Sequence, residues 1–159
     1  FSFVAQRIDQ LPGELLQNPT PSPSPTPSSS PTLTIKLVPK FANGTLLRAR
    51  GDVKVYTIIN SESGGWRRHI TDGRIFSFYG LSFKNVIEVD PEVLNYYKES
   101  KLIRLDKDKK VYELDKSNLK HWLDMSGESF LAYGRKFESV FLINKNEFNF
   151  YKTGAAYKK

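Results

Sequence analysis

The same order of hydrophobic and aromatic residues occurs twice along this chain. Six residues recur 56 positions later: Leu46, Arg48, Asp52, Lys54, Val55 and Tyr56 match Leu102, Arg104, Asp108, Lys110, Val111 and Tyr112. Nine more recur at an offset of 54: Gly73, Phe76, Tyr79, Gly80, Phe83, Val86, Asn95, Tyr97 and Lys98 match Gly127, Phe130, Tyr133, Gly134, Phe137, Val140, Asn149, Tyr151 and Lys152. This ordered recurrence of glycines and aromatics indicates an internal duplication.

The two copies predict the same elements. Runs of β-branched and aromatic residues predict strands over 46–50, 54–60, 66–70 and 83–89, and over 102–106, 110–114, 120–123 and 137–143. A short helix is expected after the third strand of each copy, and another closes each copy. The expected capping residues are Thr71 or Asp72, Ser126, Asp90 followed by Pro91, and Asn144 with Glu147, and the expected left-handed residues are Gly80 and Gly134.

These elements predict an α+β fold made of two tandem ββαβα-like repeats, 34–100 and 101–154. A unit of about 50 residues buries too little apolar surface to be stable alone, so we expect the two repeats to share a core. Residues 155–159 form a basic tail.

The start of the chain has a different composition. Residues 1–17 form an arm or anchor stub whose apolar residues include Phe1, Phe3, Val4 and Ile8. Residues 18–33 hold six of the nine prolines, alternating with Ser and Thr, which predicts an extended tether of at most about 50 Å. Because the chain begins at Phe1 rather than Met, we expect that an upstream segment has been removed.

Composition narrows the functional classes. The formal net charge is +7, and residues 1–34 contribute −1, so residues 35–159 carry about +8. A basic folded region favours acidic partners, although lysines that only keep the surface soluble are an alternative. The absence of cysteine excludes disulfides and thiolate chemistry, and no apolar run is long enough to span a bilayer.

Both copies carry a recognisable pattern. It runs Lys54-Val55-Tyr56, Arg67-Arg68-His69-Ile70, Phe76, Gly80, Phe83, Val86, Val89 and Tyr97. The pattern resembles a repeat of secreted and cell-surface bacterial proteins, including those of Gram-positive and candidate-phyla-radiation bacteria. The resemblance covers roughly residues 46–154 and implies an extracellular or cell-surface location, but it implies neither a settled ligand nor any catalytic residue. Val53 stands where that repeat has Pro, and His69 stands where it has Trp.

The strongest candidate binding site combines aromatic and basic residues on the third strand of each copy. Its members are Trp66, Arg67, Arg68 and His69 in the first copy and Lys120, His121 and Trp122 in the second. Since side chains alternate along a strand, Trp66 and Arg68 are expected on one face, with Arg67 and His69 on the other. Such residues can stack on sugars or bases and neutralise phosphates. The alternative is that one face packs inside while the cations face solvent.

The sequence contains no recognisable catalytic or metal motif. His69 and His121 have no nearby nucleophile or orienting acid, and no His-x-x-x-His spacing occurs. Arg50-Gly51-Asp52 is better explained as a turn than as an integrin motif. We therefore expect no enzyme activity, no cofactor and no metal.

Two functions remain. The first is a structural or interaction protein that displays tandem modules at the cell surface and assembles with copies of itself through its N-terminal arm, because an apolar arm can add to a neighbour's sheet edge. The second is a module that binds an anionic cell-wall polymer or glycan, with nucleic acid as a less favoured ligand. A membrane contact would require a segment that this chain lacks.

Overall fold

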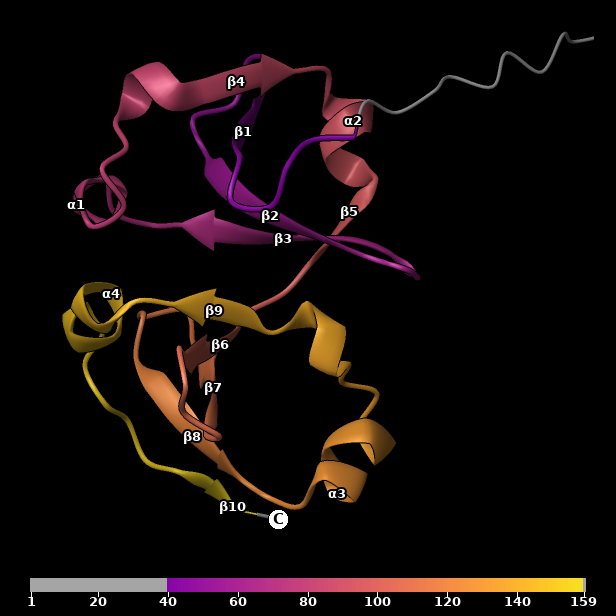
Figure 1. Ribbon diagram of the computed structural model, residues 1–159, viewed down its shortest axis with the longest axis vertical. Coiled ribbons are helices and arrows are strands. Elements are labelled where there is room, and N and C mark those ends of the chain that lie inside the picture. The colour runs from indigo at the N-terminus through magenta and orange to yellow at the C-terminus, as the bar shows by residue number, and fades with distance from the viewer. Residues whose placement is uncertain (1–39, 159) are drawn as a thin grey trace, which may run out of the picture. The chain divides into compact units, whose positions relative to one another are not determined.

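The computed structural model describes residues 40–158 and has an α+β fold with two five-stranded mixed sheets (Figure 1). The predicted arm (Phe1, Phe3, Val4 and Ile8) and the tether over 18–33 lie outside the described residues. The α+β class is therefore confirmed for the part of the chain that the structure describes.

The first sheet has the order β4 (Val86–Val89), β1 (Leu46–Ala49), β2 (Val55–Ser61), β3 (Gly64–Ile70) and β5 (Tyr97–Glu99). The second has the order β9 (Phe141–Ile143), β6 (Leu102–Leu105), β7 (Val111–Leu114), β8 (Lys120–Asp124) and β10 (Tyr157–Lys158). In each sheet the three central strands are antiparallel and both edge strands are parallel to their neighbours. Four strands of each sheet thus correspond in chain order and in place. The counterpart of β5 is the bridge between Lys120 and Thr153, and β10 pairs farther along β8.

The helices are short. In chain order they are α1 (Arg74–Ser77), the 3-10 turn η1 (Phe83–Asn85), α2 (Pro91–Asn95), α3 (Gly127–Ala132), the 3-10 turn η2 (Phe137–Ser139) and α4 (Lys145–Phe150). Ser126 and Asn144 cap their helices through their side chains, and Pro91 is at a first helical position, as predicted. Gly80 and Gly134 have positive φ angles and end their turns as expected.

Three local predictions were wrong. The N-cap of α1 is Gly73, which already has helical dihedral angles, rather than Thr71 or Asp72. The Asp72 carboxylate still accepts from the backbone N–H and the guanidinium of Arg74 at the start of the helix. The strands predicted to begin at Phe83 and Phe137 begin at Val86 and Phe141, after a 3-10 turn. In the first copy Ser82 and Asn85 bond reciprocally to nearby backbone, which favours the turn over an extended strand.

The sequence also missed one edge strand in each sheet. β5 follows α2 directly and pairs with β3, while β10 comes from the expected basic tail and pairs with β8. Both strands have at most three residues, which is too few for a period-two pattern. They can therefore be identified only from the strands with which they pair.

The register of the central strands shows which residues of β3 and β8 are equivalent. Tyr56 lies opposite His69, and Tyr112 lies opposite Trp122. The two tyrosines are 56 residues apart, but their partners are only 53 apart, since 122 − 69 = 53. His69 and Trp122 are therefore in equivalent positions on β3 and β8, although the residues of the following helices match at 54.

The largest apolar cluster contains residues from both halves of the described chain. The first half contributes Leu46, Val55, Ile70, Ile75 and Phe76, and the second contributes Ile103, Leu114, Phe141, Ile143 and Tyr151. Separate smaller clusters lie within each half. Burial of these side chains stabilises the packing of one half against the other.

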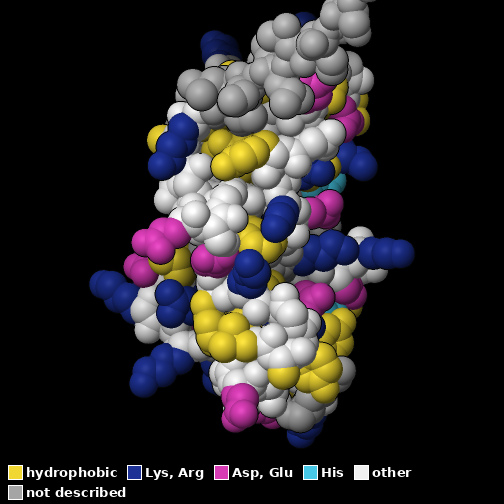
Figure 2. Space-filling view, turned by 90° about the vertical axis from the view of Figure 1, so that its right-hand side faces the viewer, with side chains coloured by type: hydrophobic (Ala, Val, Ile, Leu, Met, Phe, Trp, Pro, Cys, Tyr) yellow, Lys and Arg dark blue, Asp and Glu magenta, His cyan; other side chains and the backbone are white. Residues whose placement is uncertain are grey.

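Several large apolar side chains remain exposed. They are Val53, Tyr79, Phe83, Ile87, Tyr96, Leu131, Tyr133, Phe137, Leu142 and Tyr157. Figure 2 views the side that carries α2, β5 and α3, where separate hydrophobic patches lie among Lys and Arg side chains. Exposed apolar and basic side chains therefore lie together on this face of the molecule (Figure 2).

Candidate functional site

The predicted binding residues of β3 lie on two faces, as the alternation predicted. Trp66 packs against the cluster shared by the two halves, and Arg68 is buried on the same side. On the other side Arg67 lies 5.1 Å from the ring centroid of Tyr56, and the ring of His69 lies 5.3 Å from it. The strand does not present its four candidate residues to one partner.

Two of the basic residues bind the ends of helices. The Arg67 guanidinium donates to the carbonyl of Leu94 at 2.6 Å, and the Lys120 ammonium donates to the carbonyl of Phe148 at 2.6 Å. Lys120 donates also to the Tyr151 carbonyl at 2.7 Å. Each cation thus satisfies acceptors at the C-terminal end of α2 or α4, where positive charge is favoured. Burial also lowers the pKa of Lys120.

His121 is held inside the second half. Its Nδ1 donates to the carbonyl of Ala155 at 2.8 Å, its Nε2 is 3.2 Å from the Asp115 carboxylate, and its ring stacks on Tyr157. The carbonyl, opposed by burial but helped by Asp115, raises the pKa of His121. Burial, together with Lys54, lowers the pKa of His69. The two histidines occupy different environments and do not form one site.

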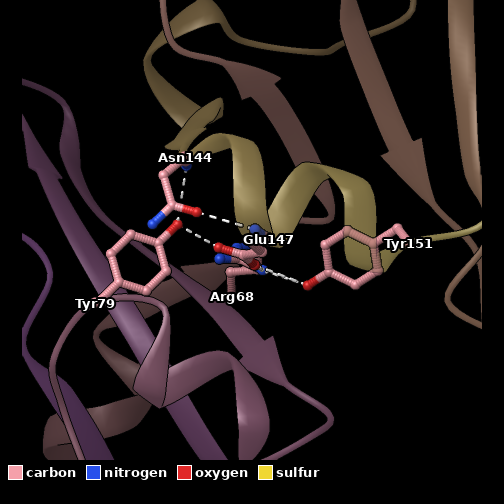
Figure 3. A network of polar contacts seen from close by, with 5 residues as sticks. All are labelled: Arg68, Tyr79, Asn144, Glu147 and Tyr151. Carbon is pink, nitrogen blue, oxygen red and sulfur yellow. Dashed lines mark hydrogen bonds and ion pairs between the residues drawn. The ribbon is translucent and has the colours of Figure 1, made fainter.

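A buried polar network joins the two halves (Figure 3). Arg68 comes from β3, and its Nη1 lies 2.7 Å from Oε1 of Glu147 on α4. Tyr151 donates to the same carboxylate oxygen at 2.8 Å and accepts from Arg68 Nη1 at 3.1 Å. Tyr79 donates to the other oxygen, Oε2. Glu147 is fully buried, at 0% exposure, so both of its oxygens depend on these partners.

The surroundings keep Arg68 charged and the two tyrosines of this network neutral. Burial by itself lowers the pKa of Arg68, but the Glu147 carboxylate, Tyr151 and Tyr79 together outweigh burial and the pKa is raised. Burial, with a further contribution from Glu147, raises the pKa of Tyr79. Burial also raises the pKa of Tyr151, against the opposing effect of Arg68. Both tyrosines therefore remain neutral donors over the range in which proteins are stable.

Hydrogen bonds also join the N-terminal end of α4 to the first half. The Asn144 backbone N–H donates to the Tyr79 hydroxyl at 3.2 Å, and its side-chain amide donates to the carbonyl of Phe78 at 2.8 Å. Its side-chain oxygen accepts from the N–H of Glu147 at 2.9 Å. One residue thus caps α4 and fastens it to the loop after α1.

An apolar cleft of about 560 Å³ lies between the first sheet and β9. Its walls are mainly apolar, and its polar residues lie at the end of β2 and beside the network. The lining residues are Asn43, Gly44, Leu46, Thr57, Ile59, Asn60, Arg68, Ile70, Ile75, Phe76, Tyr79, Leu81, Val140, Phe141 and Leu142. The volume is within the range that binds small molecules or side chains, and the lining suits an apolar partner.

A smaller depression of about 270 Å³ contains the remaining predicted residue, Trp122. The Lys110 ammonium lies 4.5 Å from the centroid of the Trp122 ring, and Lys109 and Phe137 line the same depression. The expected pairing of an aromatic ring with a surface lysine occurs here, and it occurs again where the exposed Lys98 ammonium lies 5.9 Å from the centroid of the Trp66 ring.

Sequence reasoning missed the acidic member of the network. Glu147 was expected only as part of a capping pair with Asn144, yet its carboxylate faces Arg68. The equivalent residue of the first half, 54 positions earlier, is Val93. A carboxylate in place of a buried valine could have indicated an ion pair, although its partner could not be found without the fold.

Among residues 40–158 no group of three or more His, Asp or Glu side chains is arranged to hold a metal ion, and no helix there is long and apolar enough to cross a membrane. The chain matches no protein-family model, no curated protein and no solved structure.

Proposed function

We propose that this protein is a non-catalytic interaction protein built from two tandem repeats of one module. The matching strand orders of the two sheets support a common origin of the repeats. The equal roles of Arg67 and Lys120 support it too, since each binds the carbonyl end of the closing helix of its own half. A duplicated module that keeps such contacts is typical of proteins that present surfaces rather than a single reactive centre.

The observation that carries this proposal is that the buried charged residues bond to one another across the boundary between the two halves. Arg68, Glu147 and the hydroxyl of Tyr151 bond to one another at the boundary between the halves. Their role is to fix one module on the other. The partner surface is then the apolar cleft that this packing forms.

We place this protein at the cell surface or outside the cell. The support is the resemblance of residues 46–154 to a repeat of secreted and cell-surface bacterial proteins, and the proline-rich stretch over 18–33. A proline-rich spacer holds a displayed unit away from its anchor.

Self-assembly through the N-terminal arm is testable with the full chain. We expect wild-type protein to form concentration-dependent assemblies in sedimentation velocity. Replacing Phe1, Phe3, Val4 and Ile8 together by serine should yield monomers, because the apolar surface that drives association is removed. The control is Val53→Ser, which changes a valine that is 88% exposed outside the arm. Wild-type protein that stays monomeric at high concentration would contradict self-assembly.

A second candidate function is binding of an anionic polymer. The observation that favours it is the depression in which Lys110 lies over Trp122, with Lys109 beside it. Rings that stack on sugars together with cations that neutralise phosphates suit a glycan or a wall polymer.

Binding of a glycerol-phosphate polymer tests this second function. We expect affinity to fall as salt rises, and the double variant Lys109→Gln/Lys110→Gln to lower the salt slope by about 2, roughly one unit for each lost phosphate contact. Lys84→Gln/Lys116→Gln removes the same charge elsewhere and should leave most of the binding intact. If the wild-type protein fails to bind this polymer at low salt, the depression is not a polymer site.

A further inference from the structure

β9 is an unusual edge strand. It ends the order of the second sheet, pairing with β6 on one side. The residues 140–143 are all apolar, and Leu142 is 56% exposed. Edge strands are normally protected by charged residues, proline or covering elements, because their free backbone groups recruit other strands. An apolar edge of this kind is suited to pairing with another segment.

The apolar cleft lies directly beside this edge. Val140, Phe141 and Leu142 form one wall, while the first sheet and α1 form the other. A segment that paired with β9 would therefore place alternate side chains in the cleft. Main-chain hydrogen bonds to β9 and burial of side chains in the cleft would then both stabilise the bound segment.

The charge in the cleft indicates the chemistry of the occupant. The guanidinium of Arg68 is balanced by Glu147, so the site has no excess charge to attract an ion. Nε of Arg68 is nevertheless buried without a hydrogen-bond partner among the described residues. An unpaired buried donor favours a neutral acceptor such as a peptide carbonyl. The occupant that fits is an extended, uncharged and apolar peptide segment.

We propose that this occupant is the N-terminal segment, residues 1–8, of a second copy of the chain. Its first six residues are uncharged, and Phe1, Phe3 and Ala5 alternate with Ser2 and Val4 as a strand in an apolar cleft requires. This inference rests on the proposed self-assembly and specifies the cleft as the surface that receives the N-terminal segment. Because the donated segment and the receiving cleft are different surfaces, each copy can donate one segment and receive another, which builds a reciprocal dimer, a ring or an open chain according to the geometry of the contact.

A synthetic peptide with the sequence of residues 1–10, labelled at its C-terminus, is the probe. The receptor is the full chain carrying Phe1→Ser, Phe3→Ser and Val4→Ser, so that its own segment does not compete. We expect saturable binding by fluorescence anisotropy, and at least a tenfold loss with Leu142→Asp in the receptor. Leu131→Asp is the matched control, because this leucine of α3 is 53% exposed and lies outside the cleft. A peptide with serine at positions 1, 3 and 4 should not bind.

Hydrogen exchange gives a readout that does not depend on a substitution. Peptide binding should slow exchange of the amides of β9 and leave those of β10, an edge strand of the same sheet, unchanged. Equal protection of both edges, or of neither, would overturn the proposed site.

The outcomes separate this inference from the proposed function. A peptide that does not bind, while the arm substitutions still abolish assembly of the full chain, would overturn the cleft as receptor and leave self-assembly standing. A peptide that binds while the wild-type chain remains monomeric would overturn the second copy as occupant. Mixing the arm variant with Leu142→Asp should give 1:1 pairs only, since one arm and one cleft remain functional.

Discussion

Replacing Glu147 by valine is expected to destabilise the folded chain by about 3–5 kcal/mol, because the buried Arg68 guanidinium loses its counter-charge. The substitution places at 147 the residue type that the first half has at the equivalent position, Val93. The loss reports the unpaired Arg68 charge together with the Tyr79 and Tyr151 hydroxyls, which no longer have the Glu147 carboxylate as acceptor. Chemical denaturation followed by fluorescence measures the free energy of unfolding.

A double-variant cycle and an exposed ion pair serve as controls. Adding Arg68→Met to Glu147→Val should recover the part of the lost stability that comes from the unpaired charge, since an apolar pair can replace a buried ion pair at little cost. The part that remains reports the Tyr79 and Tyr151 hydroxyls, which have lost their acceptor. Glu88→Gln breaks the Arg48–Glu88 pair, whose side chains are 40% and 43% exposed, and should cost less than about 1 kcal/mol. If Glu147→Val costs no more than Glu88→Gln, the network does not hold the two halves together.

Replacing Gly65 by alanine is expected to cost about 1–3 kcal/mol, because the new methyl group would overlap a packed ring. A Cβ at this position of β3 would overlap Cδ1 and Cε1 of Tyr97, which is almost completely buried in the smaller core of the first half. The ring has little room to move away, so we expect the strand pair β3–β5 to shift. Thermal and chemical unfolding measure the loss, and the NMR resonances of the Tyr97 ring should move.

Gly127 provides the matched glycine control. A Cβ there would meet only Phe137 Cζ, at 3.5 Å, which is an ordinary contact. Since Gly127 begins α3, alanine should be neutral or slightly stabilising. A Gly65→Ala protein as stable as Gly127→Ala would show that the Tyr97 ring is not tightly held.

Local chemistry explains which elements could be predicted from the sequence. Ser126, Asn144 and Pro91 define helix starts through contacts within three residues, and Gly80 and Gly134 adopt the left-handed conformation that ends a helical turn. The alternation along β3 correctly separated Trp66 and Arg68 from Arg67 and His69. The same reasoning failed at Phe83 and Phe137, where a 3-10 turn forms in place of an extended strand. Ser82 and Asn85 bond to nearby backbone in the first turn, and the Ser139 hydroxyl donates to the Lys136 carbonyl in the second.

The sequence by itself therefore determined the α+β class, most strands and helices, and which β3 side chains share a face, because these depend on short-range periodicity and capping. Only the tertiary structure decided that Arg68 meets Glu147, 79 residues away by numbering (147 − 68), and that an apolar cleft lies beside β9. It also decided that Lys120 and His121 are buried with partners from the end of the chain. The physical reason is that the cost of burying a charge is offset only by a partner brought close by the fold, and no local pattern identifies that partner.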